Sequence, residues 1–324
     1  MTVPPAPDLA DVLAARQRIA PYLRPTPLYR YPALDAMTGA QLWVKHENHQ
    51  PVGAFKVRGG VSLISQLTAD ERRRGVIAAS TGNHGQSVAY AAEKFGVRAI
   101  VCVPEHANPV KVESMRALGA EVVFHGRDFD AAREYCEKQA TEHGYRYFHS
   151  GDEPLHIAGV ATYTLEILED RPGIEAIVVA VGGGSGAAGA CVVAKAVRPS
   201  IEVIGVQSEA APAAYRSWRT RSLAEASTST FAEGLATRTA FELPQRIMWE
   251  QLDDFVLVSD DALRTATRVM IEKTHNLVEP AGAAALAAVL AAPERFAGRQ
   301  VAVICSGGNI SPAQLLELWP RETA

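Results

Sequence analysis

One lysine of this 324-residue chain stands in an unusual setting. Residues 50–60 read QPVGAFKVRGG, which places Lys56 between Phe55 and Val57 and among three glycines. A lysine in apolar surroundings has a lowered pKa, and its neutral amine can form a Schiff base or remove a proton. The stretch can also open a helix in which Lys56 is a solvated residue of the first turn. Taken alone, the stretch favours this second interpretation.

A second polar group follows the apolar run GVIAA. The motif STGNHGQS puts Thr81, Gly82, Asn83 and His84 at a strand-to-helix turn. Backbone N–H groups point outward at such a turn and favour an anion, for example a carboxylate. Helix capping by Ser80, Thr81 or Asn83 is favoured as a single explanation. Both interpretations can hold, since a cap and a carboxylate compete for the same donors.

A third candidate is the glycine-rich turn VGGGSGAAG. Gly184, Gly186 and Gly189 form a GxGxxG dinucleotide fingerprint after a predicted strand, and Glu209 lies near the end of the next strand. The run of three glycines 182–184 instead favours one phosphate monoester bound by consecutive N–H groups. Glycines that only permit tight packing are the weakest interpretation. The motif alone does not decide between the two cofactors.

A fourth candidate is CSGGNIS, which follows the apolar run VAVI. Ser306 places a neutral hydroxyl at a strand end, and two glycines after it allow a flat group to approach. An ordinary turn explains this stretch about equally well.

The composition limits the class of protein. The chain is 48% hydrophobic and 21% charged, with a net charge of −4, so no basic field suits nucleic acid or an anionic membrane. No uncharged run is long enough to span a membrane, and we interpret 281–292 as a buried helix. The four cysteines are scattered without metal-ligand spacing, which fits a reducing compartment. We expect a soluble, cytoplasmic protein.

Predicted strands and helices alternate along most of the chain, which indicates parallel sheets with both faces covered. The pattern predicts two α/β lobes, one from about residue 51 to 150 and the other built from both ends of the chain. The predicted strands are 75–80, 97–104, 120–126, 176–184, 201–208, 255–259 and 300–308, and the predicted helices include 83–95, 108–119, 129–144 and 187–197. Ligands collect beyond the carboxyl ends of parallel strands, where the glycine-containing turns lie.

In this order the motifs resemble those of the fold-type II pyridoxal-phosphate enzymes, in the serine/threonine dehydratase and serine racemase family. The resemblance runs from RPTPLY to CSGGN and includes KxExxQP, FKxRG, SxGNHxQ, the glycine loop, EPAGA and SGGN. It implies a tryptophan synthase β-like fold, with pyridoxal 5′-phosphate held between two parallel-sheet α/β lobes. The implied large cofactor-binding domain is 1–50 and 151–324, and the implied small mobile domain is 51–150.

The resemblance also implies roles for particular residues. Lys56 resembles the lysine that carries the cofactor and then acts as base, and Thr81 is the second residue implied as catalytic. The substrate carboxylate would be held by Thr81, Asn83 and His84. The cofactor would be bound by Phe55, Lys56, Asn83, Gly182, Gly183, Gly184, Ser185, Gly186, Glu279 and Ser306. The neutral Ser306 hydroxyl, facing the pyridine nitrogen, favours elimination over transamination.

Several positions depart from the family pattern. Ala54 stands where family members usually have serine, and Ser185 occupies the fourth position of the glycine loop. We expect the cation site of the family to be absent here. Gln207 stands where the first glutamate ligand of that site usually lies, and alanines follow where further acidic ligands are expected. Glu209 alone does not supply enough oxygen ligands for a divalent ion. We therefore expect no metal.

These residues favour a dehydratase (ammonia-lyase) that converts a β-hydroxy amino acid such as L-threonine or L-serine to a 2-oxo acid and ammonia. A racemase of the same fold is the first alternative, a β-replacement transferase is less favoured, and a dinucleotide-binding Rossmann protein is the alternative from another class. Candidates for the pocket beyond the substrate Cβ are His46, His49, Arg238 and the loop 231–240, and a surface or structural role explains each of them equally well. A homodimer is expected from the resemblance only.

Overall fold

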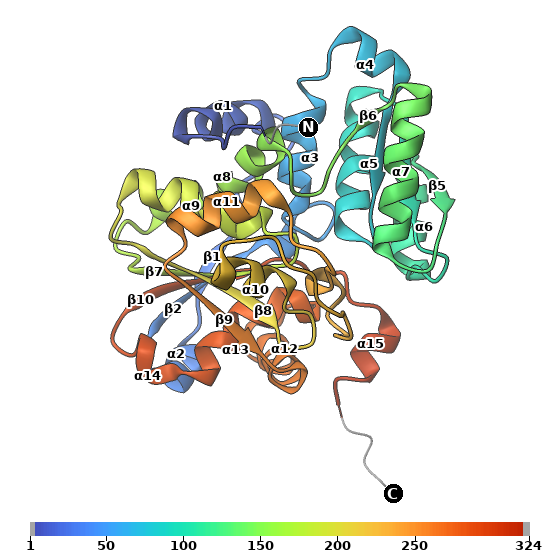
Figure 1. Ribbon diagram of the computed structural model, residues 1–324. Helices are drawn as coiled ribbons and strands as arrows, with labels where there is room; N and C mark the ends of the chain where they lie inside the picture. Colours follow the sequence, from blue (N-terminus) through green and yellow to red (C-terminus); the bar gives the residue numbers. More distant parts are fainter. Residues whose placement is uncertain (1–3, 320–324) are drawn as a thin grey trace, which may run out of the picture.

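The computed structural model describes residues 4–319, which form two separate β-sheets covered by helices (Figure 1). The six-stranded sheet has the order β1-β2-β10-β7-β8-β9, and the four-stranded sheet has the order β5-β4-β3-β6. The strands are β1 (Leu28–Arg30), β2 (Gln41–His46), β3 (Val76–Ala79), β4 (Ala99–Val103), β5 (Glu121–Phe124), β6 (Arg146–Tyr147), β7 (Ala176–Ala180), β8 (Glu202–Ser208), β9 (Asp254–Val258) and β10 (Gln300–Cys305).

Helices connect nearly all of these strands. Those of the first half are α1 (Leu9–Ile19), α2 (Pro32–Thr38), α3 (Lys56–Ile64), α4 (Ala69–Arg74), α5 (Asn83–Phe95), α6 (Pro109–Ala117), α7 (Phe129–His143) and α8 (Pro154–Asp170). Those of the second half are α9 (Ser185–Val197), α10 (Ala213–Thr220), α11 (Glu242–Gln251), α12 (Asp260–Thr274), α13 (Ala284–Ala291), α14 (Pro293–Phe296) and α15 (Pro312–Leu316). The short 3-10 helices are η1 (Glu47–His49), η2 (Glu233–Leu235) and η3 (Pro280–Ala283).

The larger sheet is buried on both faces. All its strand pairs are parallel except β1 with β2. Along β7, Ile177 and Val179 belong to the core under α1, α8, α9 and α11, while Ala176 and Val178 belong to the core under α2, α12 and α13. This alternation follows from the two-residue period of a strand and explains why the strand sequences are almost continuously apolar.

The smaller sheet is parallel throughout and is built from residues 76–147. Val76 and Ala78 face the core shared with α3, α5 and α6, whereas Ile77 and Ala79 face α7. Figure 1 shows α5, α6 and α7 grouped around this sheet, to one side of the larger one. The predicted alternation of strands and helices is therefore confirmed, including the buried helix within 281–292. The division into a large and a small mobile domain stays a prediction, and residues 1–3 and 320–324 of the predicted large domain lie outside the described residues.

A buried ionic network fixes α3. The guanidinium of Arg58 donates from Nε to Glu47 Oε2 (2.7 Å) and from Nη1 to Glu166 Oε1 (2.6 Å), and Lys45 Nζ donates to Glu166 Oε2 (2.5 Å). The side chains of Arg58 and Glu47 are 1% and 0% exposed. The two cations, Arg58 and Lys45, thus pair with the two carboxylates of Glu47 and Glu166 largely away from solvent. The network joins α3 to β2 and to α8.

Glycines bring α3 close to its neighbours. A Cβ on Gly60 would lie 2.7 Å from the backbone oxygen of Ser87 on α5. A Cβ on Gly159 of α8 would lie 2.6 Å from the backbone oxygen of Arg58. Only glycine permits these approaches, so the residues that follow Lys56 serve helix packing.

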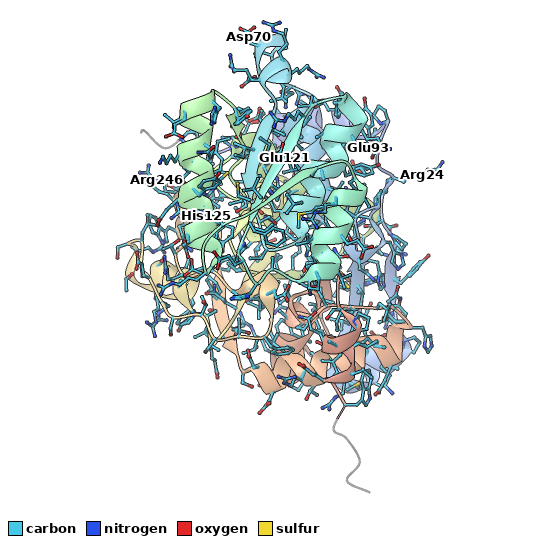
Figure 2. The ribbon with its side chains drawn as sticks, turned by 90° about the vertical axis from the view of Figure 1, so that its right-hand side faces the viewer. Arg24, Asp70, Glu93, Glu121, His125 and Arg246 are labelled. Atoms are coloured by element: carbon cyan, nitrogen blue, oxygen red, sulfur yellow. The ribbon has the colours of Figure 1, made fainter. Side chains whose placement is uncertain are left out.

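Charged side chains gather on the outside, as the sticks at Asp70, Glu93 and Arg24 show (Figure 2). Among the described residues no helix is both long enough and apolar enough to cross a membrane.

Replacing Arg58 tests the buried network. Arg58→Leu leaves the carboxylate of Glu47 buried without its partner, which typically destabilises a protein by about 3–5 kcal/mol. We expect the Tm, followed by circular dichroism, to fall by at least about 5 °C. Arg73→Leu is the control, because its pair with Asp70 is exposed, and its Tm should change by less than about 1 °C. Equal Tm values for the two variants would show that the network does not stabilise the fold.

Candidate active site

A cavity that is partly open to solvent lies where strands of both sheets end. Its walls come from the start of α3 and from the turns after β3, β7 and β10, together with η2 and η3. Every residue that the resemblance implies as catalytic, cofactor-binding or carboxylate-binding lines this cavity: Phe55, Lys56, Thr81, Asn83, His84, Gly182, Gly183, Gly184, Ser185, Gly186, Glu279 and Ser306. Their proposed roles remain predictions.

Lys56 is the first residue of α3, as the helix-opening interpretation predicts, but its side chain is only partly exposed and its amine is hydrogen-bonded within the protein. Its Nζ lies 2.8 Å from Ser185 Oγ, 2.9 Å from the carbonyl oxygen of Ser150 and 3.3 Å from His156 Nε2. No described carboxylate forms an ion pair with it. Burial lowers the pKa of Lys56 from 10.5 to about 7. At neutral pH a large fraction of this lysine is therefore a neutral amine that can act as nucleophile or base.

The loop between β7 and α9 is shaped as an anion site. A Cβ on Gly182 would lie 2.2 Å from the backbone oxygen of Gly234, and one on Gly183 would lie 2.3 Å from the ring of Phe241. Gly184 has φ +91°, in the left-handed region that favours glycine. In the described structure the backbone N–H groups of 182–186 have no protein acceptor. This cluster of free donors at the start of α9 suits a phosphate group.

The turn between β3 and α5 offers a second set of free donors. Ser80 Oγ accepts from the N–H of Gly82 (2.9 Å) and of Gly85 (2.8 Å), so it is Ser80 that supplies the capping interaction. The N–H groups of Thr81, Asn83 and His84 have no acceptor among the described residues. Capping and anion binding are thus compatible here, because they use different donors.

Five side chains from separate segments of the chain form a polar network along one wall. Asn83 donates from Nδ2 to Glu279 Oε1 (2.5 Å) and accepts from Asn309 Nδ2 (2.8 Å). Lys111 Nζ lies 2.6 Å from Glu233 Oε2 and 3.5 Å from Glu279 Oε2. Burial opposes the charge of Lys111, but the two glutamates outweigh it and raise its pKa. The charge of this lysine is therefore compensated within the protein.

Two further predicted residues, Phe55 and Ser306, also line the cavity. The ring of Phe55 has its centroid 5.3 Å from Lys56 Nζ and packs edge-on against Tyr163. The Ser306 hydroxyl follows β10 and is buried, and its one bond is a long one of 3.4 Å to the carbonyl of Ala281. A neutral hydroxyl with spare hydrogen-bonding capacity therefore faces this part of the cavity.

For three candidates of the outer pocket, the alternative of a surface or structural role holds. His46, His49 and Arg238 do not line the cavity, since they bond to Tyr31 (2.8 Å), Asn276 (2.5 Å) and the carboxylates of Asp128 and Asp130 (both 3.3 Å). The loop 231–240 does contribute, through its residues 233–237.

Other residues of the site were missed. Lys111, Phe129, Ser150 and Phe241 line the cavity, and His156 contacts Lys56 from outside it. Ser150 and Lys111 could have been found, because each lies within a turn, or a helix start, that follows a strand of the smaller sheet. Glu209 lies away from the cavity, and the described residues contain no group of three or more potential metal-ligating side chains. The expectation that no metal binds stays a prediction.

The donor set fits pyridoxal phosphate. The site combines a desolvated lysine for an aldehyde, a cradle of free N–H groups for a phosphate, and an aromatic ring and a hydroxyl for a flat heterocycle. The second set of N–H groups remains for a substrate carboxylate. A dinucleotide also carries a second phosphate and a ribose, whereas one phosphate and one carboxylate are enough to pair with these two sets of donors.

Comparisons with known proteins agree with this geometry. A family model described as pyridoxal-phosphate dependent enzyme matches residues 19–307. L-threonine ammonia-lyase of Thermotoga maritima is 37% identical over 304 residues, which are 93% of this chain and 75% of the relative. L-threo-3-hydroxyaspartate ammonia-lyase of Saccharomyces cerevisiae is 34% identical over 305 residues, 94% of each chain. The structure of maize serine racemase has a TM-score of 0.91 at 31% identity and covers 97% of both chains.

These matches confirm the predicted fold class, the predicted cofactor and the prediction of a dehydratase (ammonia-lyase). The alternative interpretation of the glycine loop as a dinucleotide fingerprint is wrong. The racemase structure keeps isomerisation as the alternative activity. The chain belongs to the pyridoxal-phosphate dependent enzymes, in the group that contains the serine/threonine dehydratases and serine racemases.

Proposed function

We propose that this enzyme eliminates water from L-threonine or L-serine, giving a 2-oxo acid and ammonia. The observation that carries the proposal is Lys56, whose desolvated amine is surrounded by neutral hydrogen-bond partners between two clusters of free N–H donors. The bound cofactor supplies an electron sink that acidifies the substrate Cα–H. The protein supplies the base, the binding of both anions and the exclusion of water.

The residues that would hold the cofactor come from four segments. Lys56 would anchor it covalently, and the N–H groups of 182–186 would bind its phosphate. Phe55 would lie against the ring, and Ser306 would face the ring nitrogen. Asn83 would bond the ring oxygen while Glu279 keeps its amide oriented.

The substrate is held so that its α-proton faces the lysine. The N–H groups of Thr81, Asn83 and His84 would bind the carboxylate at the start of α5, where the helix dipole adds to the attraction. Burial lowers the pKa of His84 to about 3, and its Nε2 lies 3.1 Å from the carbonyl oxygen of Phe148. Its imidazole is therefore neutral and fixed, and Lys56 is the base. With the cofactor bound, Lys56 would take the α-proton of the substrate on Nζ, and the β-hydroxyl would leave as water with a proton from the ammonium so formed.

The walls of the cavity favour a small, uncharged side chain on the substrate. Phe129, Leu235 and Phe241 are apolar, which suits the hydrogen of serine or the methyl of threonine at Cβ. Besides Lys56, the lysine that lines the cavity is Lys111, and Glu233 and Glu279 compensate it. A second substrate carboxylate, as in 3-hydroxyaspartate, would therefore lose its hydration without gaining a free cation.

A homodimer, a cytoplasmic location and a small domain that moves against the large one also belong to this proposal. Membership of the family supports the first and third. The net charge of −4 and the buried, unpaired cysteines support a reducing compartment.

Removing the amine of Lys56 tests its proposed role. Lys56→Ala should fold normally but lose at least about three orders of magnitude in kcat, because the covalent anchor and the base are lost together. The yellow chromophore that borohydride bleaches should also disappear. Lys94→Ala, at an exposed position, is the control and should behave as wild type. Substantial 2-oxo acid production by Lys56→Ala would refute the proposed role.

The substrate preference follows from the compensated charge of Lys111. The wild-type kcat/KM should be at least about tenfold higher for L-threonine or L-serine than for L-threo-3-hydroxyaspartate. Glu233→Gln removes one of the two carboxylates beside Lys111 and should lower the ratio of kcat/KM for L-threonine to kcat/KM for L-threo-3-hydroxyaspartate. Glu242→Gln, whose exposed carboxylate pairs with Arg246, should leave the ratio unchanged. A wild-type preference for the dicarboxylic substrate would contradict the interpretation.

Thr81 bears on elimination against racemisation. Racemisation needs an acid–base group on the face opposite Lys56, and the methyl of Thr81 stiffens its χ1 and crowds the path to the substrate Cα. In deuterated water, chiral chromatography of L-serine reactions should therefore show pyruvate with far slower formation of D-serine. D-serine carrying α-deuterium at the rate of pyruvate release would instead establish a racemase, and Thr81→Ala would show whether this hydroxyl is the second base.

A further inference from the structure

One buried histidine contacts the amine of Lys56 without lining the cavity. His156 lies in the first turn of α8 and is 0% exposed. Its Nε2 is 3.3 Å from Lys56 Nζ. The substrate and the cofactor would lie on the cavity side of the lysine, so the histidine acts on the reaction only through Lys56.

The partners of Lys56 match the geometry of an ammonium. A protonated lysine has three N–H donors and no acceptor. The carbonyl of Ser150, the hydroxyl of Ser185 and the imidazole of His156 are three acceptors within 3.3 Å of Nζ. All three are uncharged, so they stabilise the ammonium without the strong bias toward it that a carboxylate would impose.

The setting of His156 keeps its ring neutral and fixed. The ring packs edge-on against Phe148 and His84, and a Cβ on Gly59 would lie 1.9 Å from its Nδ1, so this glycine of α3 makes room for it. Burial, with the neighbouring ionisable groups of Lys56 on α3, His84 on α5 and His149 before α8, lowers the pKa of His156 well below 6.5.

A hydrogen bond to Lys56 also explains an unpaired atom. When Nε2 accepts a proton from Lys56, the ring proton of the neutral imidazole is on Nδ1. In the described structure Nδ1 is buried without a partner. An unpaired buried N–H destabilises the fold, and an apolar side chain of similar size would avoid this. The structure therefore gives His156 no favourable polar contact other than the one with Lys56.

We propose that His156 is a positioning residue for Lys56, and that its Nε2 accepts the third N–H of the ammonium formed when Lys56 takes the proton of the substrate. The proposal rests on the role of Lys56 as base. The neutral amine needs acceptors for two N–H groups only, and Ser150 and Ser185 provide them. The third acceptor is needed from the moment the α-proton reaches Nζ until the lysine passes that proton on. His156 thus makes a partly buried lysine a stronger base.

The proton affinity of Lys56 can be measured without catalysis. In the full-length chain freed of cofactor, mass spectrometry follows acetylation of Lys56 by acetic anhydride against pH, with the exposed Lys138 as internal reference. His156→Leu should lower the midpoint for Lys56 by about one pH unit, because the ammonium loses an acceptor that the neutral amine does not need. With the cofactor bound, His156→Leu should have a kcat at least about tenfold below that of the wild type, while KM changes by less than about threefold.

A matched pair of variants separates the effect of hydrogen bonding from that of packing. The pair also tests the proposal if His156→Leu does not fold. His156→Gln can place an amide oxygen near the position of Nε2 and should restore most of the midpoint and of kcat. His156→Asn is polar but too short to reach Nζ and should restore neither. His46→Leu removes an equally buried histidine on β2 and should leave Lys56 unchanged.

Two results would overturn the proposal. A wild-type midpoint and kcat in His156→Leu, or equal behaviour of the Gln and Asn variants, would show that His156 only fills space. A midpoint that shifts while kcat stays at the wild-type value would overturn the proposal through its premise, because Lys56 would then not be the base in the rate-limiting step. Loss of activity in Lys56→Ala tests that premise separately.

Discussion

The site depends on keeping the amine of Lys56 out of water while still offering it hydrogen-bond partners. Burial brings its pKa to about 7, so that one side chain can be a nucleophile, a base and a carrier of a proton at neutral pH. A carboxylate beside it would hold the lysine in the charged form, and the described structure places none there. The contacts instead come from a carbonyl, a hydroxyl and a neutral imidazole.

The fold produces this environment by fixing α3, the helix that Lys56 opens. The buried charges of Arg58, Glu47 and Glu166 join α3 to η1 and α8, and Gly59 and Gly60 allow α8 and α5 to approach. The same arrangement brings the turn after β3 in the smaller sheet opposite the turns after β7 and β10 in the larger one. Two clusters of free N–H donors and one amine thus converge from segments far apart in the chain.

The sequence predicted much of this because its signals are local. An apolar run followed by a glycine-rich turn marks a strand end, and strand ends are where ligands bind in parallel sheets. Thr81, Gly182 and Ser306 were identified in this way, whereas Lys56 was singled out by its apolar, glycine-flanked setting. The helix 83–95 was predicted with the bounds that α5 has.

What the sequence could not provide was contact between distant residues. The pairing of Lys111 with Glu233 and the approach of His156 to Lys56 depend on how helices cross, and no local pattern encodes that crossing. The same limit applies to His46, the last residue of β2, whose Nε2 lies 2.8 Å from the hydroxyl of Tyr31 and which does not line the cavity.

The most direct measurement is the location of the covalent link between protein and cofactor. The holoenzyme is reduced with borohydride, digested and mapped by mass spectrometry. The account predicts a pyridoxyl group on the peptide that contains Lys56 and on no other lysine peptide. A pyridoxyl group on the peptide that contains Lys111 or Lys45, with Lys56 unmodified, would contradict it.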